Sequence, residues 1–243
     1  MSLSKNHIKL ITSLQQKKYR QKHQLFVAEG IKVVKEFLNS SFILEKLFVV
    51  DADFLDENIP QEKIVFISDV ELKKISQLKS PNKVLALFKT PVLEEIKDEG
   101  LIVVLDEIND PGNLGTIIRL CDWFGISQLI CSKNTVDCYN QKVVQASMGS
   151  LTRILISYID VLEFVKNTNL PVFSADMDGQ NVYKTQLPEK AVLIMGNEAN
   201  GVSEAIMQEV QNKIAIPRFG NLQETESLNV ATATAILLSE FRR

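Results

Sequence analysis

Three loop segments carry residues that ordinary chain connections do not require. The first reads NDPGNLGTIIR over residues 109–119, and the second reads GNEANG over residues 196–201. The third ends in Ser227-Leu228-Asn229, ahead of an apolar run rich in Ala and Thr. Glycine lets the backbone approach an anion closely, so a loop of Asn, Pro and Gly followed by one arginine resembles a phosphate cradle.

The first loop matches no common nucleotide-binding fingerprint. It lacks the lysine of G-x-x-x-x-G-K-[ST], and its glycines do not follow G-x-G-x-x-G. Taken one at a time, the other two motifs also have structural explanations. Gly196 and Gly201 would then supply turns, and Ser203 and Ser227 would be helix N-caps. These simpler roles stay open for each motif alone.

Arg119 is harder to explain as a structural residue. The helix expected around it consists mainly of Ile, Leu, Cys, Trp and Phe. A guanidinium on such a helix needs a carboxylate or an anionic ligand to offset its desolvation. We expect Glu198 to be the carboxylate partner and an RNA phosphate to be the ligand.

From residue 101 onward, apolar strands alternate with helical or loop segments. This order predicts a parallel sheet that is covered on both faces, and ligands of such sheets bind beyond the carboxyl ends of the strands. The first and second motifs directly follow predicted strands. The strands expected are LIVVLD, QLIC, LPVFSAD, AVLIMG and KIAIP.

The N-terminal part has its own alternation of helices and strands. Residues 5–18 have helical spacing, and IKVVKEFLNS and DVELKKISQLK are expected helices. The strands expected are QLFVAEG, LEKLFVVD, KIVFIS and NKVLALFKT. The charged segment PVLEEIKDEG opens with proline and is typical of a linker. We therefore divide the chain into a small α/β domain (1–90), a linker (91–100) and a larger α/β domain (101–243).

Composition excludes several classes of protein. With 45% hydrophobic and 23% charged residues, and no apolar run long enough to span a bilayer, we expect a cytoplasmic globular protein. The three cysteines, Cys121, Cys131 and Cys138, lack C-x-x-C spacing, which indicates reduced thiols. The sequence has only two histidines, His7 and His23, so we expect no metal site.

The net charge of −3 argues against a protein that coats nucleic acid indiscriminately, but residues 1–24 contain no Asp or Glu. Such a basic segment can neutralise phosphates. It can equally be a solvated amphipathic helix with Ile8, Ile11 and Leu14 facing inward, and composition alone leaves both interpretations open. The basic residues are Lys5, Lys9, Lys17, Lys18, Arg20 and Lys22.

Together the three motifs resemble those of a known family. NDPGNLGTIIRLCDWFGI, IMGNEANGVS and IPRFGNLQETESLNVATATAILL look like the three motifs of the SpoU/TrmH branch of the SPOUT RNA methyltransferases, in the family's order and spacing over residues 101–243. The segment KKYRQKHQLFVAEGIKVVKEF resembles the substrate-binding domain that precedes the catalytic domain in many members. Arg20, Phe26, Glu29 and Gly30 stand at its characteristic places.

This resemblance implies an enzyme that transfers a methyl group from S-adenosylmethionine to a ribose 2′-hydroxyl of ribosomal or transfer RNA, with ribosomal RNA favoured. It implies a homodimer formed through the C-terminal domain. The implied fold is α/β, with a SPOUT α/β-knot preceded by the small α/β substrate-binding domain. The knot is a trefoil in a mainly parallel sheet with helices on both faces, which general topology rules would not have predicted.

The resemblance also assigns roles by position. Asn113 and Arg119 would face the RNA and the reacting ribose, Glu198 would hold Arg119, and Ser227 and Asn229 would lie at the catalytic centre. Because guanidinium does not give up its proton in proteins, we expect Arg119 to bind a phosphate and stabilise the developing alkoxide rather than act as a base.

The resemblance and the basic segment also predict which residues contact the methyl donor and which contact RNA. The methyl donor would lie against Met195, Gly196, Asn197, Gly201, Ile216, Pro217 and Leu228. RNA would contact Lys17, Lys18, Arg20 and Lys22 as well as Arg119. Ala199 stands where many members have glycine, and we expect the loop to accept alanine through a negative φ.

Three alternatives remain. A related SPOUT enzyme could methylate a base, although the Ser-Leu-Asn sequence of the third motif favours ribose oxygen. A non-catalytic RNA-binding or ribosome-associated factor could keep the fold, although the complete set of motif residues counts against it. An unrelated α/β protein could bind a mononucleotide and have no affinity for S-adenosylmethionine.

Overall fold

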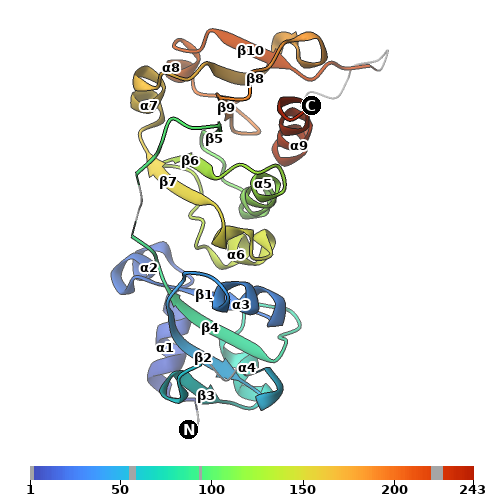
Figure 1. Ribbon diagram of the computed structural model, residues 1–243. Coiled ribbons are helices and arrows are strands. Elements are labelled where there is room, and N and C mark those ends of the chain that lie inside the picture. Colours follow the sequence, from blue (N-terminus) through green and yellow to red (C-terminus); the bar gives the residue numbers. More distant parts are fainter. Residues whose placement is uncertain (1–2, 55–58, 93–94, 220–226) are drawn as a thin grey trace. The chain divides into compact units, whose positions relative to one another are not determined.

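The computed structural model describes residues 3–54, 59–92, 95–219 and 227–243 (Figure 1). Its elements group into two units. The first unit comprises Met1–Val92 together with Asp137–Thr152, and the second comprises Leu93–Val136 together with Arg153–Arg243. The chain therefore enters the first unit twice, the second time from within the region in which the sequence places the larger domain.

The first unit is built on a four-stranded mixed sheet with the strand order β1-β4-β2-β3. Strand β4 is antiparallel to both of its neighbours, and β2 and β3 are parallel. All four strands fall in segments that the sequence predicts. The strands are β1 (Leu25–Glu29), β2 (Leu44–Val49), β3 (Ile64–Phe66) and β4 (Val84–Lys89). The helices are α1 (Lys5–Ser13), α2 (Lys17–His23), α3 (Ile31–Leu38), α4 (Asp69–Ile75) and α6 (Gln141–Ser147), with short 3-10 turns η1 (Ala52–Phe54), η2 (Gln61–Lys63) and η3 (Ser150–Thr152).

The single helix expected over residues 5–18 is wrong, because the chain forms α1 and α2 with a turn between them. Leu14 is buried at the end of α1, where it joins the core. Arg20 of α2 donates from Nη1 to the carbonyl oxygens of Leu14 (2.8 Å) and Gln15 (2.9 Å). Carbonyls at a helix C-terminus lack partners within the helix, so this arginine stabilises the break between the two helices.

Alternation along β1 separates two cores in the first unit. Leu25 and Val27 pack with residues of α1 and α4 on one face of the sheet. Phe26 points to the opposite face and contacts the ring of Tyr139, with centroids 4.7 Å apart. Phe26 also contacts Phe37, Phe42 and Phe88. Tyr139 belongs to the second chain segment of this unit, and burial raises the pKa of its hydroxyl.

The second unit contains a six-stranded sheet with the order β10-β8-β9-β5-β6-β7, in which all neighbours are parallel. This confirms the predicted parallel sheet. The strands are β5 (Leu101–Leu105), β6 (Gln128–Ser132), β7 (Leu155–Ile159), β8 (Val172–Asn181), β9 (Ala191–Met195) and β10 (Asn212–Ala215). Strand β7 was not predicted, because it is an edge strand in which only part of the side chains are buried.

Helices cover both faces of this sheet. Helices α7 (Val161–Asn167) and α8 (Glu204–Met207) contribute to one apolar core, and α5 (Pro111–Trp123) and α9 (Val230–Phe241) lie on the other side of the strands (Figure 1). The 3-10 turn η4 (Val182–Lys184) follows β8 and contacts α9. The helices expected around the first and third motifs are therefore α5 and α9, which pack against each other.

The trefoil threading would involve the loop that contains residues 220–226, which lie outside the described residues, so the knot stays a prediction. In the part of the chain that the structure describes, no helix has the length and apolar character needed to cross a bilayer.

Candidate active site

The first motif becomes the beginning of α5. Asp110 is the N-cap, and its Oδ1 accepts a hydrogen bond from the backbone N–H of Asn113 at 2.8 Å. Pro111 follows at the first helical position, where its fixed φ and missing N–H suit a helix start. This cap places the side chain of Asn113 in the first turn of α5.

The second motif forms a closed loop after β9. Asn197 and Gly201 exchange two backbone hydrogen bonds of 2.9 and 2.8 Å. A Cβ atom at Gly196 would lie 2.2 Å from the carbonyl carbon of Gly201 and 2.2 Å from the backbone nitrogen of Val202. Only glycine allows this close approach of backbone to backbone, which accounts for glycine at position 196.

Ala199 fits this loop without strain. It is not among the non-glycine residues with positive φ, as the sequence analysis expects. The backbone N–H of Ala199 donates to Oδ1 of Asn197 at 2.9 Å. Nδ2 of the Asn197 side chain donates to the carbonyl oxygen of Glu107 at 2.8 Å. The Asn197 side chain thus holds the loop in shape.

Asn113 connects the three motifs. Its Nδ2 donates to Oε1 of Glu198 at 2.5 Å, and its Oδ1 accepts from Nδ2 of Asn229 at 2.9 Å. Asn229 is the N-cap of α9, where its Oδ1 accepts from the N–H groups of Ala231 and Thr232. The two amides and one carboxylate therefore meet where the N-terminal ends of α5 and α9 lie. The positive ends of two helix dipoles favour negative charge at this point.

The opposite ends of the same helices are also joined. Arg242 donates from Nε to the carbonyl oxygen of Phe124 at 2.9 Å and from Nη2 to that of Gly125 at 3.1 Å. These carbonyls lie just beyond the C-terminal end of α5, where a cation is favourable. Helices α5 and α9 therefore run in the same direction, held at both ends.

Arg119 lies apart from this cluster of bonds. It is exposed on the outer face of α5, in the helical row that contains Thr116 and Trp123. Within the described residues its guanidinium makes no hydrogen bond or ion pair. The expected pair between Arg119 and Glu198 is not present, since Glu198 bonds Asn113 instead. The expectation that Arg119 needs a partner to offset its desolvation is also wrong for the single chain, because its guanidinium reaches solvent.

Comparisons with known proteins agree with this arrangement. The model of the SpoU rRNA Methylase family matches residues 100–239, and the model of the MRM3-like substrate binding domain matches residues 5–86. The chain belongs to the SpoU rRNA methylase family. This confirms the family that the three motifs predict.

Individual SpoU relatives match along almost the whole chain. The 23S rRNA (guanosine(2553)-2′-O)-methyltransferase RlmP of Bacillus subtilis is 29% identical over 94% of this chain and 93% of its own. A solved structure from Porphyromonas gingivalis, assigned to the TrmH family of RNA methyltransferases, is 38% identical with a TM-score of 0.89, covering 99% and 98% of the two chains. The AdoMet-bound rRNA methyltransferase of Sinorhizobium meliloti is 27% identical with a TM-score of 0.86, covering 100% and 97%.

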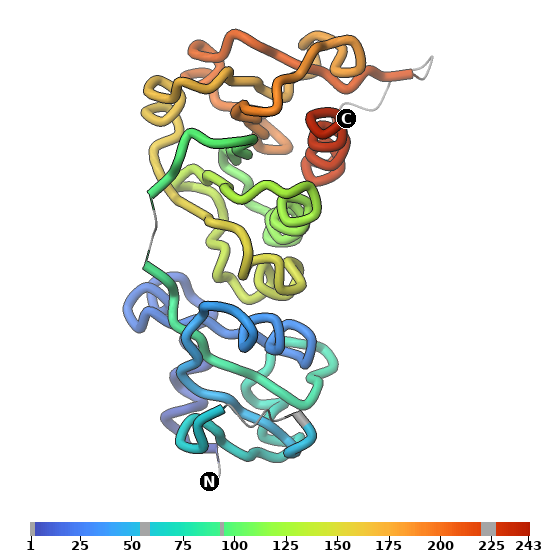
Figure 2. Tube along the Cα trace, in the orientation of Figure 1, coloured from blue at the N-terminus to red at the C-terminus, as the bar shows by residue number. Residues whose placement is uncertain are grey.

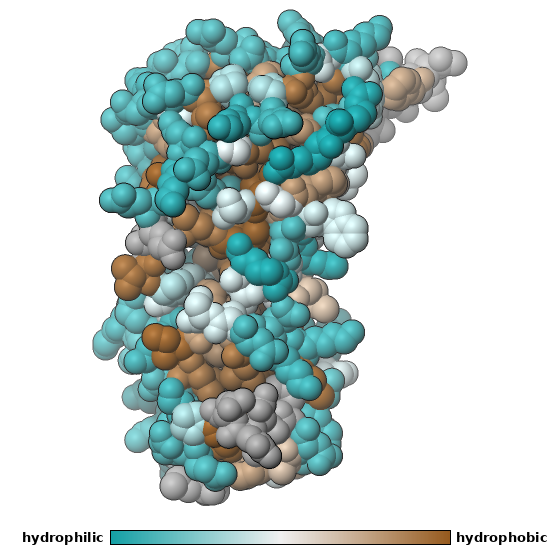
Figure 3. All heavy atoms as spheres, viewed as in Figure 1, coloured by the Kyte–Doolittle hydropathy of each residue, from teal (hydrophilic) through white to brown (hydrophobic). Residues whose placement is uncertain are grey.

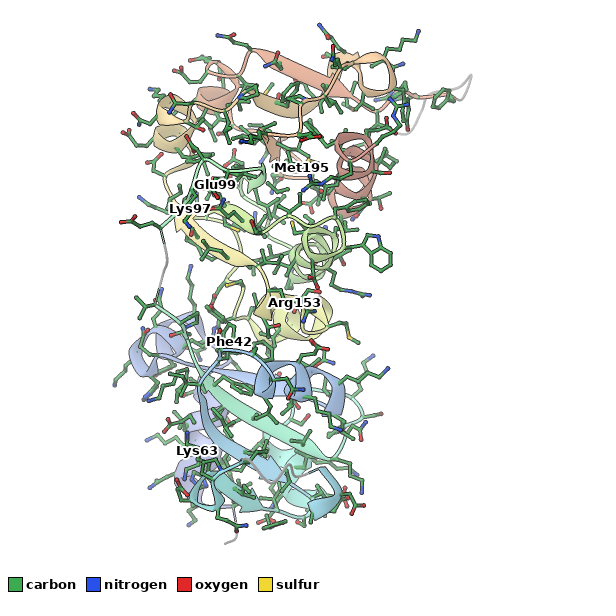
Figure 4. All side chains as sticks on the ribbon, viewed as in Figure 1. Phe42, Lys63, Lys97, Glu99, Arg153 and Met195 are labelled. Carbon is green, nitrogen blue, oxygen red and sulfur yellow. The ribbon has the colours of Figure 1, made fainter. Side chains whose placement is uncertain are left out.

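The residues expected around the methyl donor in this SpoU chain differ in exposure. Met195 is buried at the end of β9, and because Ile194 packs toward α7 and α8, Met195 faces the side of α5 and α9 (Figure 4). Ile216 and Pro217 are partly buried after β10. Leu228 is 48% exposed next to Ser227, which is also exposed.

Two acidic residues at the end of β5 were not among the predicted site residues. Asp106 is buried, and its Oδ2 accepts from the N–H of Ser203 at 2.8 Å, which anchors the chain that leaves the second loop. Glu107 has a φ of 57°, and its N–H donates to Oγ of Ser132 at 2.9 Å. The carboxylate that ends the strand segment LIVVLD was the available signal, since ligand sites lie at such strand ends.

The basic segment divides into exposed and buried members. Lys17, Lys18 and Lys22 are exposed on α2. Arg20 is 4% exposed, and its Nε and Nη2 donate to Oδ2 of Asp137 at 2.8 and 2.5 Å. The expectation that Arg20 contacts RNA is therefore a misassignment, because the guanidinium is enclosed and used within the first unit.

Other reactive groups do not form a second centre in the described part of the chain. No group of three or more His, Cys, Asp or Glu residues there is arranged to hold a metal ion. The three cysteines are buried, and no disulfide joins them in the described residues. Burial raises the pKa of the Cys121 thiol to about 12, which keeps it protonated and unreactive at neutral pH.

Proposed function

We propose that this SpoU protein transfers a methyl group from S-adenosylmethionine to the 2′-hydroxyl of a ribose in ribosomal RNA, in the cytoplasm. The observation that carries the proposal is the bonded cluster of Asn113, Glu198 and Asn229 at the N-terminal ends of two helices. The name of the Bacillus subtilis relative, a 23S rRNA 2′-O-methyltransferase, supports the choice of reaction and of RNA.

The residues assigned to the donor fit S-adenosylmethionine. Leu228 offers a half-exposed apolar side chain, and Ile216 and Pro217 offer partly buried ones, which suits an adenine ring. The carbonyl groups of the loop from Gly196 to Gly201 can accept hydrogen bonds from the donor, since the N–H groups of Asn197, Ala199 and Gly201 are bonded within the loop. When bound, S-adenosylmethionine supplies a methyl group on a sulfonium sulfur, which is a good leaving group.

The cluster can orient and stabilise the attacking oxygen. A ribose hydroxyl is a weak nucleophile, so the protein must hold it in line with the methyl group and stabilise the charge that develops on its oxygen. The O–CH3 bond would form as the S–CH3 bond breaks, and the hydroxyl proton would pass to water. We assign the first task to the amides of Asn113 and Asn229, and the second to the positive ends of α5 and α9. Glu198 fixes the orientation of the Asn113 amide by accepting its N–H.

Arg119 and Ser227 complete the proposed set. Arg119 keeps its proton, so we assign it to an RNA phosphate next to the reacting ribose. Ser227 stands two residues before Asn229 and is exposed, so its hydroxyl can contact the same ribose. Lys17, Lys18 and Lys22 of the first unit would bind the RNA backbone.

We further infer that the protein acts as a homodimer through its C-terminal domain. Trp123 is 85% exposed on the same face of α5 as Arg119. Tryptophan is enriched at protein interfaces, and a second copy on this face would cover the exposed indole of Trp123. Sedimentation of wild type and Trp123→Glu tests this inference: the variant should be a monomer, and an unchanged dimer would contradict the assigned surface.

The reaction itself is tested with labelled S-adenosylmethionine and three substrates from cells that lack the protein: total ribosomal RNA, transfer RNA and intact ribosomal subunits. Nucleoside analysis should find label as a 2′-O-methylnucleoside in ribosomal RNA. Label on a base would favour the base-methylating alternative. Donor binding without transfer to any substrate would favour a non-catalytic RNA-binding factor.

A further inference from the structure

An exposed cluster on the second unit is not used by the proposed reaction. We call it the outer aromatic cluster: Met177 of β8, Tyr183 of η4, and Arg218 and Phe219 after β10. The rings of Tyr183 and Phe219 have centroids 6.4 Å apart and planes inclined by 33°. Nη2 of Arg218 lies 3.1 Å from Sδ of Met177. Pairing of β8 and β10 brings these segments side by side (Figure 2).

The cluster exposes a large apolar surface. Phe219 is 82% exposed, Met177 is 63% exposed and Tyr183 is 38% exposed. The face of this unit shown in Figure 3 is mainly hydrophilic over its outer strands, so an apolar group there needs an explanation. A large exposed apolar cluster of this kind marks a binding surface more often than a structural one.

The elements that carry the cluster also carry the candidate active site. Phe219 and Arg218 directly follow Ile216 and Pro217, the residues assigned to the methyl donor. Turn η4, which holds Tyr183, contacts α9. The N-cap of α9 is Asn229, which bonds Asn113. A ligand on the outer aromatic cluster would therefore rest on the same framework as the reacting ribose.

We propose that the outer aromatic cluster stacks an unpaired nucleobase of the RNA substrate, an inference that rests on the proposed function. The exposed ring of Phe219 supplies the stacking face, and Tyr183 supports it from behind. Every base has a π face, so such a platform accepts RNA with little sequence preference. Arg218 adds a guanidinium that can stack on a base or meet a phosphate.

The surrounding charges favour stacking as the main contribution. Lys184 is exposed next to Tyr183 and adds one positive charge. Lys213 lies 3.5 Å from Asp176 and offsets it, and Asp178 is a further exposed carboxylate on β8. The local excess of positive charge is thus small. The gain from the base should therefore depend little on salt, unlike phosphate contacts.

The test compares RNA with and without bases on the full-length protein. Fluorescein-labelled single-stranded oligo(A) of about 12 nucleotides and an abasic ribose-phosphate strand of equal length are titrated by anisotropy at two salt concentrations. Wild type should bind oligo(A) at least about tenfold more tightly than the abasic strand. Phe219→Ala should lose most of this preference while its affinity for the abasic strand stays the same.

Three variants make the comparison specific. Phe219→Tyr keeps an aromatic face and should keep the preference. Phe219→Leu keeps apolar volume without a π face and should lose it. Val92→Ala removes a side chain that is 91% exposed in the first unit and should behave as wild type. S-adenosylmethionine binding should be unchanged in all variants.

Each contrary result has a distinct meaning. An undiminished preference in Phe219→Ala, with donor binding intact, would overturn the stacking site and leave the proposed function standing. Full preference in Phe219→Leu would show apolar docking rather than stacking and would overturn the proposal. A change of oligomeric state in Phe219→Ala would assign the cluster to a protein interface instead. A wild type that binds neither RNA nor S-adenosylmethionine would remove the proposed function as well.

Discussion

Asn229 donates from Nδ2 to Oδ1 of Asn113 at 2.9 Å, although the two residues are 116 positions apart in the sequence. This bond joins the first turn of α5 to the N-cap of α9. Because Arg242 joins the far ends of the same helices, the pair is held as one parallel unit. The two helix ends that favour negative charge are thereby fixed side by side.

Replacement of Asn113 by alanine should lower methyl transfer strongly. The change removes the donor to Glu198 and the acceptor for Asn229, and loss of one oxyanion-stabilising group typically costs about 10²- to 10³-fold in kcat. Donor affinity, measured by calorimetry, should stay within a few-fold. Asn167→Ala, which removes an exposed amide on α7, is the control. Normal turnover in Asn113→Ala would remove this residue from the reaction.

Replacement of Arg119 by alanine should separate activity from stability. The side chain is exposed and makes no bond within the described part of the chain, so the free energy of unfolding should change by no more than about 0.5 kcal/mol. Transfer should be abolished, with the donor still bound. Lys190→Ala serves as the exposed-cation control, and retained turnover in Arg119→Ala would show that the phosphate contact is assigned wrongly.

The glycines of the second loop should respond differently to alanine. At Gly196 a Cβ would overlap the backbone of Gly201 and Val202, so Gly196→Ala should displace the loop and abolish donor binding. At Gly201 the space is open but φ is +67°, so Gly201→Ala should cost only about 1 kcal/mol and weaken binding modestly. Equal donor affinities in calorimetry would refute the close-approach explanation.

Replacement of Arg20 by alanine should lower stability, whereas replacement of Lys18, two positions earlier, should affect RNA binding. Arg20→Ala leaves the partly buried carboxylate of Asp137 without its cationic partner and should destabilise the protein by roughly 2–4 kcal/mol. Lys18→Ala should leave stability unchanged and lower the salt dependence of RNA binding by about one counterion. Thermal unfolding and salt titrations check the two results, and unchanged stability in Arg20→Ala would contradict the structural role.

Glu29 should make stability fall as pH rises. Glu29 is 2% exposed, and burial raises the pKa of its carboxyl group although Ser76, Gln77 and Gln141 donate hydrogen bonds to it. Between its ordinary pKa and its raised pKa the folded state binds more protons than the unfolded state. Stability is therefore greatest below the ordinary pKa and is lost as pH rises through the raised value.

Glu29→Gln removes this titration, so its free energy of unfolding should vary less across the same pH range. Denaturant unfolding at several pH values measures the difference. Glu62→Gln, at an exposed carboxylate in the same unit, should keep the wild-type pH dependence. Parallel curves for wild type and Glu29→Gln would show that burial of Glu29 does not control this dependence.

Most elements of the fold follow from the sequence because their signals are local. Apolar runs predict β5, β6 and β9, and glycine and proline mark where the loops begin. Through the family resemblance the sequence also predicted that Asn113, Glu198 and Asn229 belong to one site, and their side chains are bonded to one another. It paired Glu198 with Arg119, however, because residue types alone do not show that Arg119 points outward while Asn113 reaches both other motifs.

The structural role of Arg20, its ion pair with Asp137, could not be predicted from local sequence signals. In the sequence it stands among lysines that bind solvent, and its partner Asp137 lies 117 residues further along the chain. Nothing in the spacing of the two residues indicates their contact. The break between α1 and α2 has the same origin, since the carbonyls of Leu14 and Gln15 are satisfied by a guanidinium from the following helix.

The return of residues 137–152 to the first unit limits how this protein can change over evolutionary time. Tyr139 fills the aromatic core around Phe26, and Gln141 donates a hydrogen bond to Glu29. The first unit therefore depends on residues from both chain segments. An exchange of residues 1–90 alone by recombination would import a core with no matching Tyr139. Substrate range in this lineage should therefore shift by point substitution on exposed surfaces, or by joint inheritance of both chain segments.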